Sequence, residues 1–326
     1  MTDPVFAQTT DSSLQPEVVS IPGGEGGIGF DDMVFSEDLH KVLVPAGHTG
    51  RLFFIDPSTH EITFIGGFSS NAQFEKGHEV GISSADEGGG CIFAADHGRH
   101  ELMAVDPKTG AVITTIKLAG DADYIRYVGF NHEVWVTEPH NKQIEVFRLV
   151  NGTEHQLFVP TALIPVLHGP ESLVVDHRRG NAYTNSGQVA AAIDLENHHI
   201  IDTWINGCEK PRGLAIDDQK GFLFESCAEG KAVVFDLNQE HKKISDLTTD
   251  PGPDVISYNP KLSHLYFTSS KNATLSVIGV SSQGGLSLLG QAHADIKAHC
   301  VVSDDQNNIW VCDPPRGQLL LYKDTY

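Results

Sequence analysis

The sequence has no apolar run of about 18 residues, the length needed for a membrane-spanning helix. It also lacks the short motifs that identify many enzymes and metal sites, with no HExxH, no EF-hand loop and no G-x-S-x-G. The glycine runs at 23–27 and 88–90 are not followed by a helical pattern, which disfavours a phosphate-binding loop. These absences predict a soluble protein whose function no local motif encodes.

Basic residues are scarce. The chain has 22 Lys and Arg against 43 Asp and Glu, a formal net charge of −21 at pH 7. Such a surface repels phosphate backbones and anionic lipid headgroups. We therefore expect no nucleic-acid partner and no membrane span. A solvated acidic surface is the simplest interpretation of the charge.

Cysteine is also scarce, with five residues and no C-x-x-C or zinc-type spacing. Folding the predicted hairpin 211–227 at its turn brings Cys227 within three residues of Cys208. Folding the hairpin 299–312 in the same way brings Cys300 almost opposite Cys312. Two short-range disulfides or two reduced thiol pairs fit this geometry, with Cys91 left over. The disulfide alternative would indicate an exported protein.

The first residues have no apolar core of the kind found in a secretory signal peptide. We interpret residues 1–15 as a flexible leader. This end of the chain leaves the compartment open.

What the sequence does contain is a repeat of short strands, clearest between Cys91 and Gly120. Runs of β-branched and other apolar residues alternate there with turn residues, among which Pro fixes φ and Gly supplies a positive φ. The strands predicted in this stretch are Ile92–Ala95, Glu101–Val105 and Ala111–Leu118.

Equivalent strand ends recur at intervals of 42 to 50 residues. Four strands per repeat at this spacing are typical of a β-propeller blade, whereas a leucine-rich solenoid repeats at about half of it. The widest interval contains an insertion, which we place at 83–90 as a turn between the first two strands of the second blade. The strand ends are Ile55, Val105, Phe147, Ile193, Phe235, Ile278 and Tyr322.

The two ends of the chain complement each other. The last repeat has three strands, and a lone strand at Glu17–Ile21 precedes the first repeat. Pairing the two closes the ring and removes an exposed sheet edge. We therefore predict an all-β fold in which residues 16–326 form a single seven-bladed β-propeller of four-stranded antiparallel blades, the N-terminal strand completing the last blade. A closed ring has no edge that demands a partner, so we expect a monomer.

Three of the predicted second strands resemble the repeat strand of a known family. Val134–Glu138, Ala182–Ser186 and Leu265–Ser269 are similar to the YVTN strand of the bacterial YVTN/YncE-like propellers, and 106–110 is similar to their usual turn. The related quinoprotein amine dehydrogenase β-chain-like propellers are similar too. The resemblance implies a compartment outside the cytoplasm, because those families include cell-surface, periplasmic and ligand-binding members. We expect a periplasmic or extracellular protein.

In a propeller, the loops that lead into the first strands and leave the second strands form a mouth of the central channel, and function is usually carried by such loops. Aligned positions before the first strands carry several carboxylates and one cation. From them we predict a ligand- or cofactor-binding set of Asp32, Glu171, Arg212 and Asp254.

Histidines also gather at these loops. The chain has 17, and six fall at or beside the predicted mouths. Imidazole together with carboxylate is what Zn²⁺, Cu²⁺, Fe²⁺ or Mn²⁺ require as ligands. The preferred metal-binding set is His78, Glu79, His97 and His299.

The same residues have a purely structural interpretation. Asp and His at turns hydrogen-bond their own backbone, and Asp often joins neighbouring blades. Arg212 would then neutralise Glu171 or Asp254 within a structural ring.

These patterns support two functions. The one we prefer is an exported propeller that binds a metal ion, a small ligand or a protein partner at its channel face. The alternative is a metal-dependent lyase, hydrolase or oxidase, in which Glu79 or Glu171 acts as general base beside metal-activated water. A third interpretation, a surface interaction module, would require a large exposed apolar patch.

Overall fold

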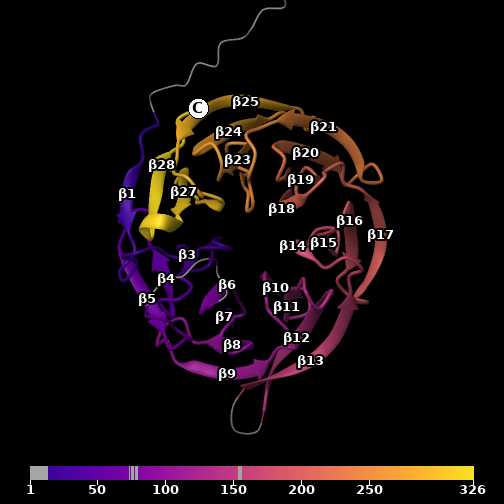
Figure 1. The fold of residues 1–326 in the computed structure, drawn as a ribbon. Coiled ribbons are helices and arrows are strands. Elements are labelled where there is room, and N and C mark those ends of the chain that lie inside the picture. Colours follow the sequence, from indigo (N-terminus) through magenta and orange to yellow (C-terminus); the bar gives the residue numbers. More distant parts are fainter. Residues whose placement is uncertain (1–13, 73, 75–76, 78–79, 153–155) are drawn as a thin grey trace, which may run out of the picture.

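The computed structural model describes residues 14–72, 74, 77, 80–152 and 156–326. Its strands form seven four-stranded antiparallel sheets arranged in a ring around a central channel (Figure 1). The predicted all-β, seven-bladed propeller is confirmed. Within the described part of the chain the one helix is a short 3-10 turn, Pro314–Arg316, and no helix there is long and apolar enough to cross a membrane.

Strands of each blade follow one another from the channel outward (Figure 1). Blade one contains β2 (Val34–Ser36), β3 (Lys41–Pro45), β4 (Arg51–Ile55) and β5 (Ile62–Gly66). Blade two contains β6 (Ile82–Gly88), β7 (Cys91–Asp96), β8 (Glu101–Val105) and β9 (Val112–Lys117). Blade three contains β10 (Ile125–Val128), β11 (Glu133–Glu138), β12 (Gln143–Asn151) and β13 (Gln156–Pro165).

The second half of the ring repeats the pattern. Blade four contains β14 (Glu171–Asp176), β15 (Asn181–Ser186), β16 (Val189–Asp194) and β17 (His199–Ile205). Blade five contains β18 (Pro211–Asp217), β19 (Phe222–Cys227), β20 (Lys231–Asp236) and β21 (Lys242–Thr248). Blade six contains β22 (Ser257–Asn259), β23 (His264–Ser269), β24 (Thr274–Val280) and β25 (Leu286–His293).

Blade seven is built from both ends of the chain. It contains β26 (Val301–Ser303), β27 (Asn308–Asp313) and β28 (Gln318–Lys323), and its outer strand is β1 (Glu17–Ser20). β1 pairs antiparallel with β28, with Val19 opposite Leu319. The predicted closure of the ring by the N-terminal strand is therefore confirmed (Figure 1).

The core is distributed between the blades. Second strands such as β11 and β27 are buried at every residue, because each blade packs a face on each of its two neighbours. Outer strands such as β9 are more open, with Val112, Thr115 and Lys117 exposed to solvent. Trp135 and Trp310, on second strands of blades three and seven, are fully buried. The aromatic residues of the repeats thus fill the spaces between sheets.

Buried carboxylates also join blades, as the structural interpretation of the sequence expected. The Tyr258 hydroxyl of blade six donates to Asp217 of blade five at 2.6 Å. The Tyr266 hydroxyl donates to Asp324, beyond β28, at 2.7 Å. Because these acids accept hydrogen bonds inside the protein, they can be buried without losing the bonds that water would provide.

The insertion in the widest repeat interval does not lie where the sequence predicted. Residues 83–88 are not a turn but belong to β6, whose Ala85 pairs with Ala94. The extra residues lie instead at 67–81, between β5 and β6. The prediction was wrong because the polar sequence around Ser84 suggested a loop. The Ser84 hydroxyl is in fact buried and donates to Asp32 at 2.6 Å.

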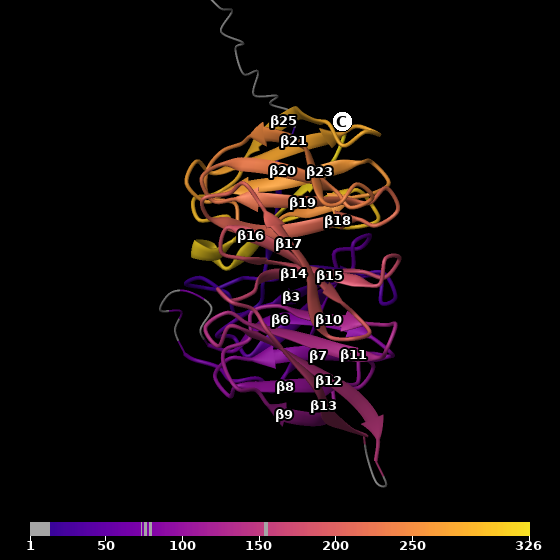
Figure 2. The same ribbon diagram turned by 90° about the vertical axis from the view of Figure 1, so that its right-hand side faces the viewer.

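Figure 2 shows the ring edge-on, with loops on both of its faces. One face of the ring carries the loops that lead into the first strands and leave the second strands. We call it the upper face. The first strand of every blade begins here, so the upper face surrounds one mouth of the channel.

Candidate functional site

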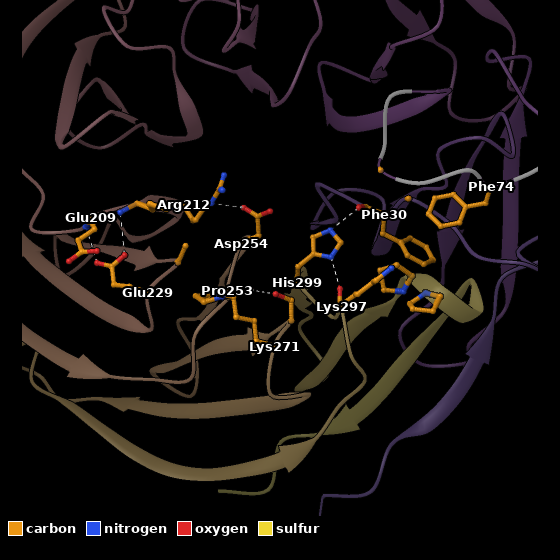
Figure 3. A pocket seen from close by; sticks show the side chains of 18 residues that line it. Phe30, Phe74, Glu209, Arg212, Glu229, Pro253, Asp254, Lys271, Lys297 and His299 are labelled. Carbon is orange, nitrogen blue, oxygen red and sulfur yellow. Dashed lines mark hydrogen bonds and ion pairs between the residues drawn. The ribbon is translucent and has the colours of Figure 1, made fainter.

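A pocket of about 670 Å³ opens on the upper face of the ring (Figure 3). Loops of four neighbouring blades, five, six, seven and one, form its wall. These loops occupy the mouth positions that the sequence predicted to carry function. We call this cavity the upper pocket, and its lining includes Phe30, Arg212, Asp254, Lys271, Lys297 and His299.

Backbone hydrogen bonds connect the lining loops of blades five to seven. The Ala228 N–H donates to the Lys210 carbonyl at 2.9 Å, and the Gly252 N–H donates to the Ala228 carbonyl at 2.9 Å. The Ser270 hydroxyl donates to the Gly252 carbonyl at 2.9 Å. The Lys297 N–H donates to the Ser270 carbonyl at 2.9 Å. The wall is therefore a continuous hydrogen-bonded chain, which fixes the loops relative to one another.

Two disulfides flank the upper pocket. One joins Cys208, before β18, to Cys227 at the end of β19, with the Cα atoms 5.3 Å apart. The other joins Cys300 to Cys312, with the Cα atoms 5.6 Å apart. Of the two alternatives left open by the sequence, the structure contains the disulfides, and Cys91 is free and buried. Each disulfide fastens the two lining loops of one blade, blade five and blade seven.

Two members of the predicted ligand-binding set, Arg212 and Asp254, line the upper pocket, and Glu171 contacts Arg212 from outside the lining. Arg212 Nη1 lies 2.5 Å from Glu171 Oε1, and Arg212 Nε lies 3.9 Å from Asp254 Oδ1. Figure 3 shows Arg212 beside Asp254, with His299 between Phe30 and Lys297. Burial raises the pKa of Glu171 although Arg212 opposes this shift. The pairing that the structural interpretation expected of Arg212 is present, and it lies at the edge of a cavity.

The fourth member, Asp32, does not contact the other three residues of the set but has its own partners. It accepts two hydrogen bonds from Arg126, at 2.6 and 2.9 Å, and one from Ser84 at 2.6 Å. Asp32 lines a second cavity of about 400 Å³, which runs along the innermost strands and which we call the channel cavity. Its carboxylate is already occupied by protein donors, so its observed role is to hold β2, β6 and β10 together.

Further carboxyl groups crowd the channel near the upper pocket. Burial raises the pKa of Asp31 well above its ordinary value, and the nearby carboxylate of Asp123 adds to the shift. Burial, followed by the charge of Glu171, does the same to Asp123. Both effects favour the protonated form of these two acids.

The predicted metal-binding set stays a prediction. His78 and Glu79 lie outside the described residues. The His97 ring nitrogen Nε2 is hydrogen-bonded to the carbonyl of Ala122. The two ring nitrogens of His299 lie 2.7 Å from the Lys297 carbonyl and 3.0 Å from the Phe30 carbonyl. Both described histidines therefore already bind backbone oxygens.

Groups of three potential metal ligands do occur elsewhere in the described part of the chain. One group is His299 with Cys300 and Cys312, and the other is Cys208 with Cys227 and Glu229. In each group the two cysteines form a disulfide. A disulfide offers no thiolate, so neither group supplies the anionic sulfur that a transition metal prefers.

Turn geometry explains much of the high histidine content. Six of the described histidines have a positive φ, a conformation that costs most residues energy but is enriched in Gly, Asn, Asp and His. In the turn between third and fourth strands, His60 and His198 occupy the position that Gly110 holds in blade two. The six are His40, His60, His100, His132, His198 and His241.

Sequence reasoning overlooked two features of this region. Arg126 is the ion-pair partner of Asp32. It is the second residue of β10 and therefore lies outside the aligned mouth positions. The lysines of the upper pocket were not recognised because each lies in a different loop, and only the assembled ring brings Lys210, Lys271 and Lys297 to one cavity. A search for basic residues at all mouth positions would have found these lysines.

Comparison with known proteins identifies the fold and no closer relationship. No family model matches the chain, and no curated protein matches it. A chain in the structure described as "Crystal Structure of Mitotic Checkpoint Complex" is similar, with a TM-score of 0.73 and 12% identity over 100% of this chain and 97% of that chain.

The β-propeller domain of Cps50 (Swd1) from Myceliophteria thermophila is also similar. Its TM-score is 0.76 at 10% identity, and the match covers 95% of this chain and 100% of that chain. At such low identity the likeness concerns the fold alone. The chain is a seven-bladed β-propeller.

Proposed function

We propose that this protein is a non-enzymatic binding protein that holds a small ligand in the upper pocket. The observation that carries the proposal is an open cavity of about 670 Å³ lined by loops of four adjacent blades. Ligand pockets typically measure about 300 to 1,000 Å³. The wall is held in place by the hydrogen-bonded chain from Lys210 to Lys297 and by two disulfides. A site that already has its ligand-bound conformation loses little conformational entropy when a ligand binds.

A protein partner that inserts a side chain or a short segment into the same pocket is the second candidate. The comparisons favour it, because one similar chain belongs to a structure described as a mitotic checkpoint complex. A rigid ring that presents loops from several blades offers a broad surface around the pocket. Both candidates place the contact at the upper face.

We further propose that the protein is exported to the periplasm or the extracellular space and belongs among the YVTN/YncE-like propellers. The two disulfides support export, since such bonds persist in oxidising compartments. Thiol titration of the unreduced, denatured protein from its native source should find one thiol per chain, from Cys91. A titre of five, the total number of cysteines in the chain, would contradict export.

The test of the binding site is to fill the pocket. Ala228 lines it and is half-buried, so Ala228→Trp should place an indole inside the cavity. A fragment library screened by ligand-observed NMR should give hits on the wild-type protein that the Ala228→Trp variant loses.

A matched control adds the same indole elsewhere. Ala111 is exposed in an outer turn of blade two, so Ala111→Trp should keep every hit. Hits that persist in Ala228→Trp, or a library without hits on the wild-type protein, would contradict a ligand site in the upper pocket.

A further inference from the structure

We infer that the ligand of the upper pocket is an organic polyanion, a compound with two or more carboxylate or phosphate groups on an apolar ring. This inference rests on the proposed function and names the chemical class that the pocket selects. The lining carries four cations, Lys210, Arg212, Lys271 and Lys297, against three carboxylates. The whole chain has 22 basic and 43 acidic residues, so basic residues are enriched in the pocket lining relative to the chain.

The three lysines of the pocket have free ammonium groups. Lys210, Lys271 and Lys297 are exposed, and none forms an ion pair within the described part of the chain. Other lysines of the same chain do pair, for example Lys41 with Asp56 at 2.6 Å and Lys220 with Asp217 at 3.3 Å. Three unpaired cations around one cavity leave a positive charge that a bound anion would neutralise.

Two of the carboxylates in the lining are already compensated, one of them in part. Glu229 accepts hydrogen bonds from the N–H groups of Glu209 and Lys210, at 2.9 and 3.2 Å, and lies 3.9 Å from Lys231. Asp254 lies 3.9 Å from Arg212 and shares this cation with Glu171, which is outside the lining. Among the described lining residues, Glu209 and part of the charge of Asp254 then remain to oppose the three lysines. The local balance therefore favours anions, although the molecule as a whole repels them.

Apolar side chains complete the recognition surface. Phe74 and Pro315 line the upper pocket with accessible side chains, whereas Phe30, Pro253 and Pro314 are buried behind its surface. Ring faces of this kind bind flat apolar groups, and lysines around them select for charge. A bare inorganic anion would leave this apolar wall unused, which is why we infer an anion carried on a ring.

The probe is trimesate, a benzene ring with three carboxylates, compared with its uncharged triamide of the same shape. Isothermal titration should detect trimesate binding to the wild-type protein, with the triamide bound at least about tenfold more weakly. Higher salt should weaken trimesate binding, because salt screens charge attraction. The triamide should show no such dependence.

Charge-removing variants connect the binding to the lysines. Each of Lys210→Gln, Lys271→Gln and Lys297→Gln should weaken trimesate binding about two- to fivefold, and the triple variant about tenfold or more. A control triple variant, Lys108→Gln, Lys142→Gln and Lys242→Gln, loses the same charge from exposed positions outside the pocket and should bind within about twofold of wild type.

The outcomes separate the ligand class from the site. Triamide binding equal to that of trimesate, with both lost in Ala228→Trp, would overturn the polyanion inference and leave the proposed pocket intact. Trimesate binding that the pocket triple variant does not weaken would also overturn it. No binding of trimesate to the wild-type protein would refute the ligand class, while the library screen would still decide the site.

Discussion

Two arginines neutralise the carboxylates of the channel at different depths. Arg126 and Asp32 are almost fully covered, with side-chain exposures of 17% and 1%. Arg212 and Glu171 are more open, at 39% and 33%. Removing one partner of a buried pair leaves an uncompensated charge, whereas an exposed carboxylate regains water. Depth should therefore decide how much each arginine stabilises the fold.

Arg126→Ala should lower the free energy of unfolding by about 3–5 kcal/mol, since Asp32 would be left buried without its cation. Arg212→Ala should cost about 1 kcal/mol or less because its partners are partly hydrated. Urea unfolding followed by tryptophan fluorescence measures both. Equal losses in the two variants would show that burial is not what distinguishes them.

A second prediction for a single residue concerns Glu225 and the pH dependence of stability. It is fully buried on β19, and neither carboxylate oxygen has a hydrogen-bond partner within the described residues. Burial raises the pKa of Glu225 well above its ordinary value. A raised pKa in the folded state means that folding binds a proton. Stability is therefore lost as pH rises from the unfolded pKa, about 4.5, toward the folded one, at about 1.4 kcal/mol per unit.

Glu225→Gln should remove this loss. The variant should have a higher midpoint of thermal unfolding than wild type at pH 8 and a similar one at pH 4.5. Glu61→Gln, at an exposed position, provides the control and should follow wild type at both pH values. A Glu225→Gln variant that is less stable than wild type at pH 8 would mean that the carboxylate has a partner in solution.

At the scale of elements, β1 closes the ring by pairing with β28. Val19 is the buried residue of this strand, and Glu17, Val18 and Ser20 are exposed. Val19 is 7% exposed, whereas its neighbour Val18 is 54% exposed. This pair of adjacent valines provides an internally controlled test of the closure.

Val19→Asp should lower the free energy of unfolding by about 3 kcal/mol or more, since a carboxylate would enter an apolar cluster without a partner. Val18→Asp should change it by about 0.5 kcal/mol or less. Chemical denaturation of both variants gives the comparison. If Val18→Asp proves as damaging as Val19→Asp, β1 is not seated on blade seven in the observed register.

The disulfides act on loops rather than on single residues. Each closes a short loop, with sequence separations of 19 and 12 residues. For loops of this size the expected stabilisation is about 3 kcal/mol per bond. Replacing Cys208 and Cys227 together by Ala should therefore lower the free energy of unfolding by about that amount. It should also weaken ligand binding, because two loops of the upper pocket would be released.

Replacement of Cys91 by Ala provides the matched control, since this thiol is free. The control should retain ligand affinity even if the lost thiol changes packing. Unfolding by urea and titration with trimesate report the two effects separately. Unchanged affinity in the Cys208→Ala, Cys227→Ala variant would show that the pocket does not need this bond to keep its shape.

The elements were predictable where local chemistry repeats. Strands such as Glu101–Val105 have an apolar pattern bounded by Asp-Pro or Gly turns, and their positions follow from sequence alone. β6 was missed because Ser84 and Asp86 look polar in sequence but satisfy neighbouring blades, Asp86 accepting the Tyr127 N–H at 2.7 Å. A polar strand whose partners lie in another blade leaves no local signal.

For the whole molecule, the period of the repeats was sufficient to predict the fold. Alignment of the repeats identified the loop positions at the mouth of the channel. The alignment of the repeats could not reveal which side chains share a cavity, because that depends on the conformation of each loop at the mouth of the channel. Lys210, Lys271 and Lys297 illustrate this limit, since they lie in three loops and carry no common motif. The predicted acidic character holds for the chain as a whole but not for the upper pocket.

Hydrogen–deuterium exchange with and without trimesate tests the central claim, ligand binding at the upper face, most directly. The account predicts slower exchange in the upper loops of blades five, six and seven, around Ala228, Gly252 and Lys297, with no change in the lower turn at 217–221. Protection of the lower turns or of the outer strands, or no protection at saturating trimesate, would contradict it.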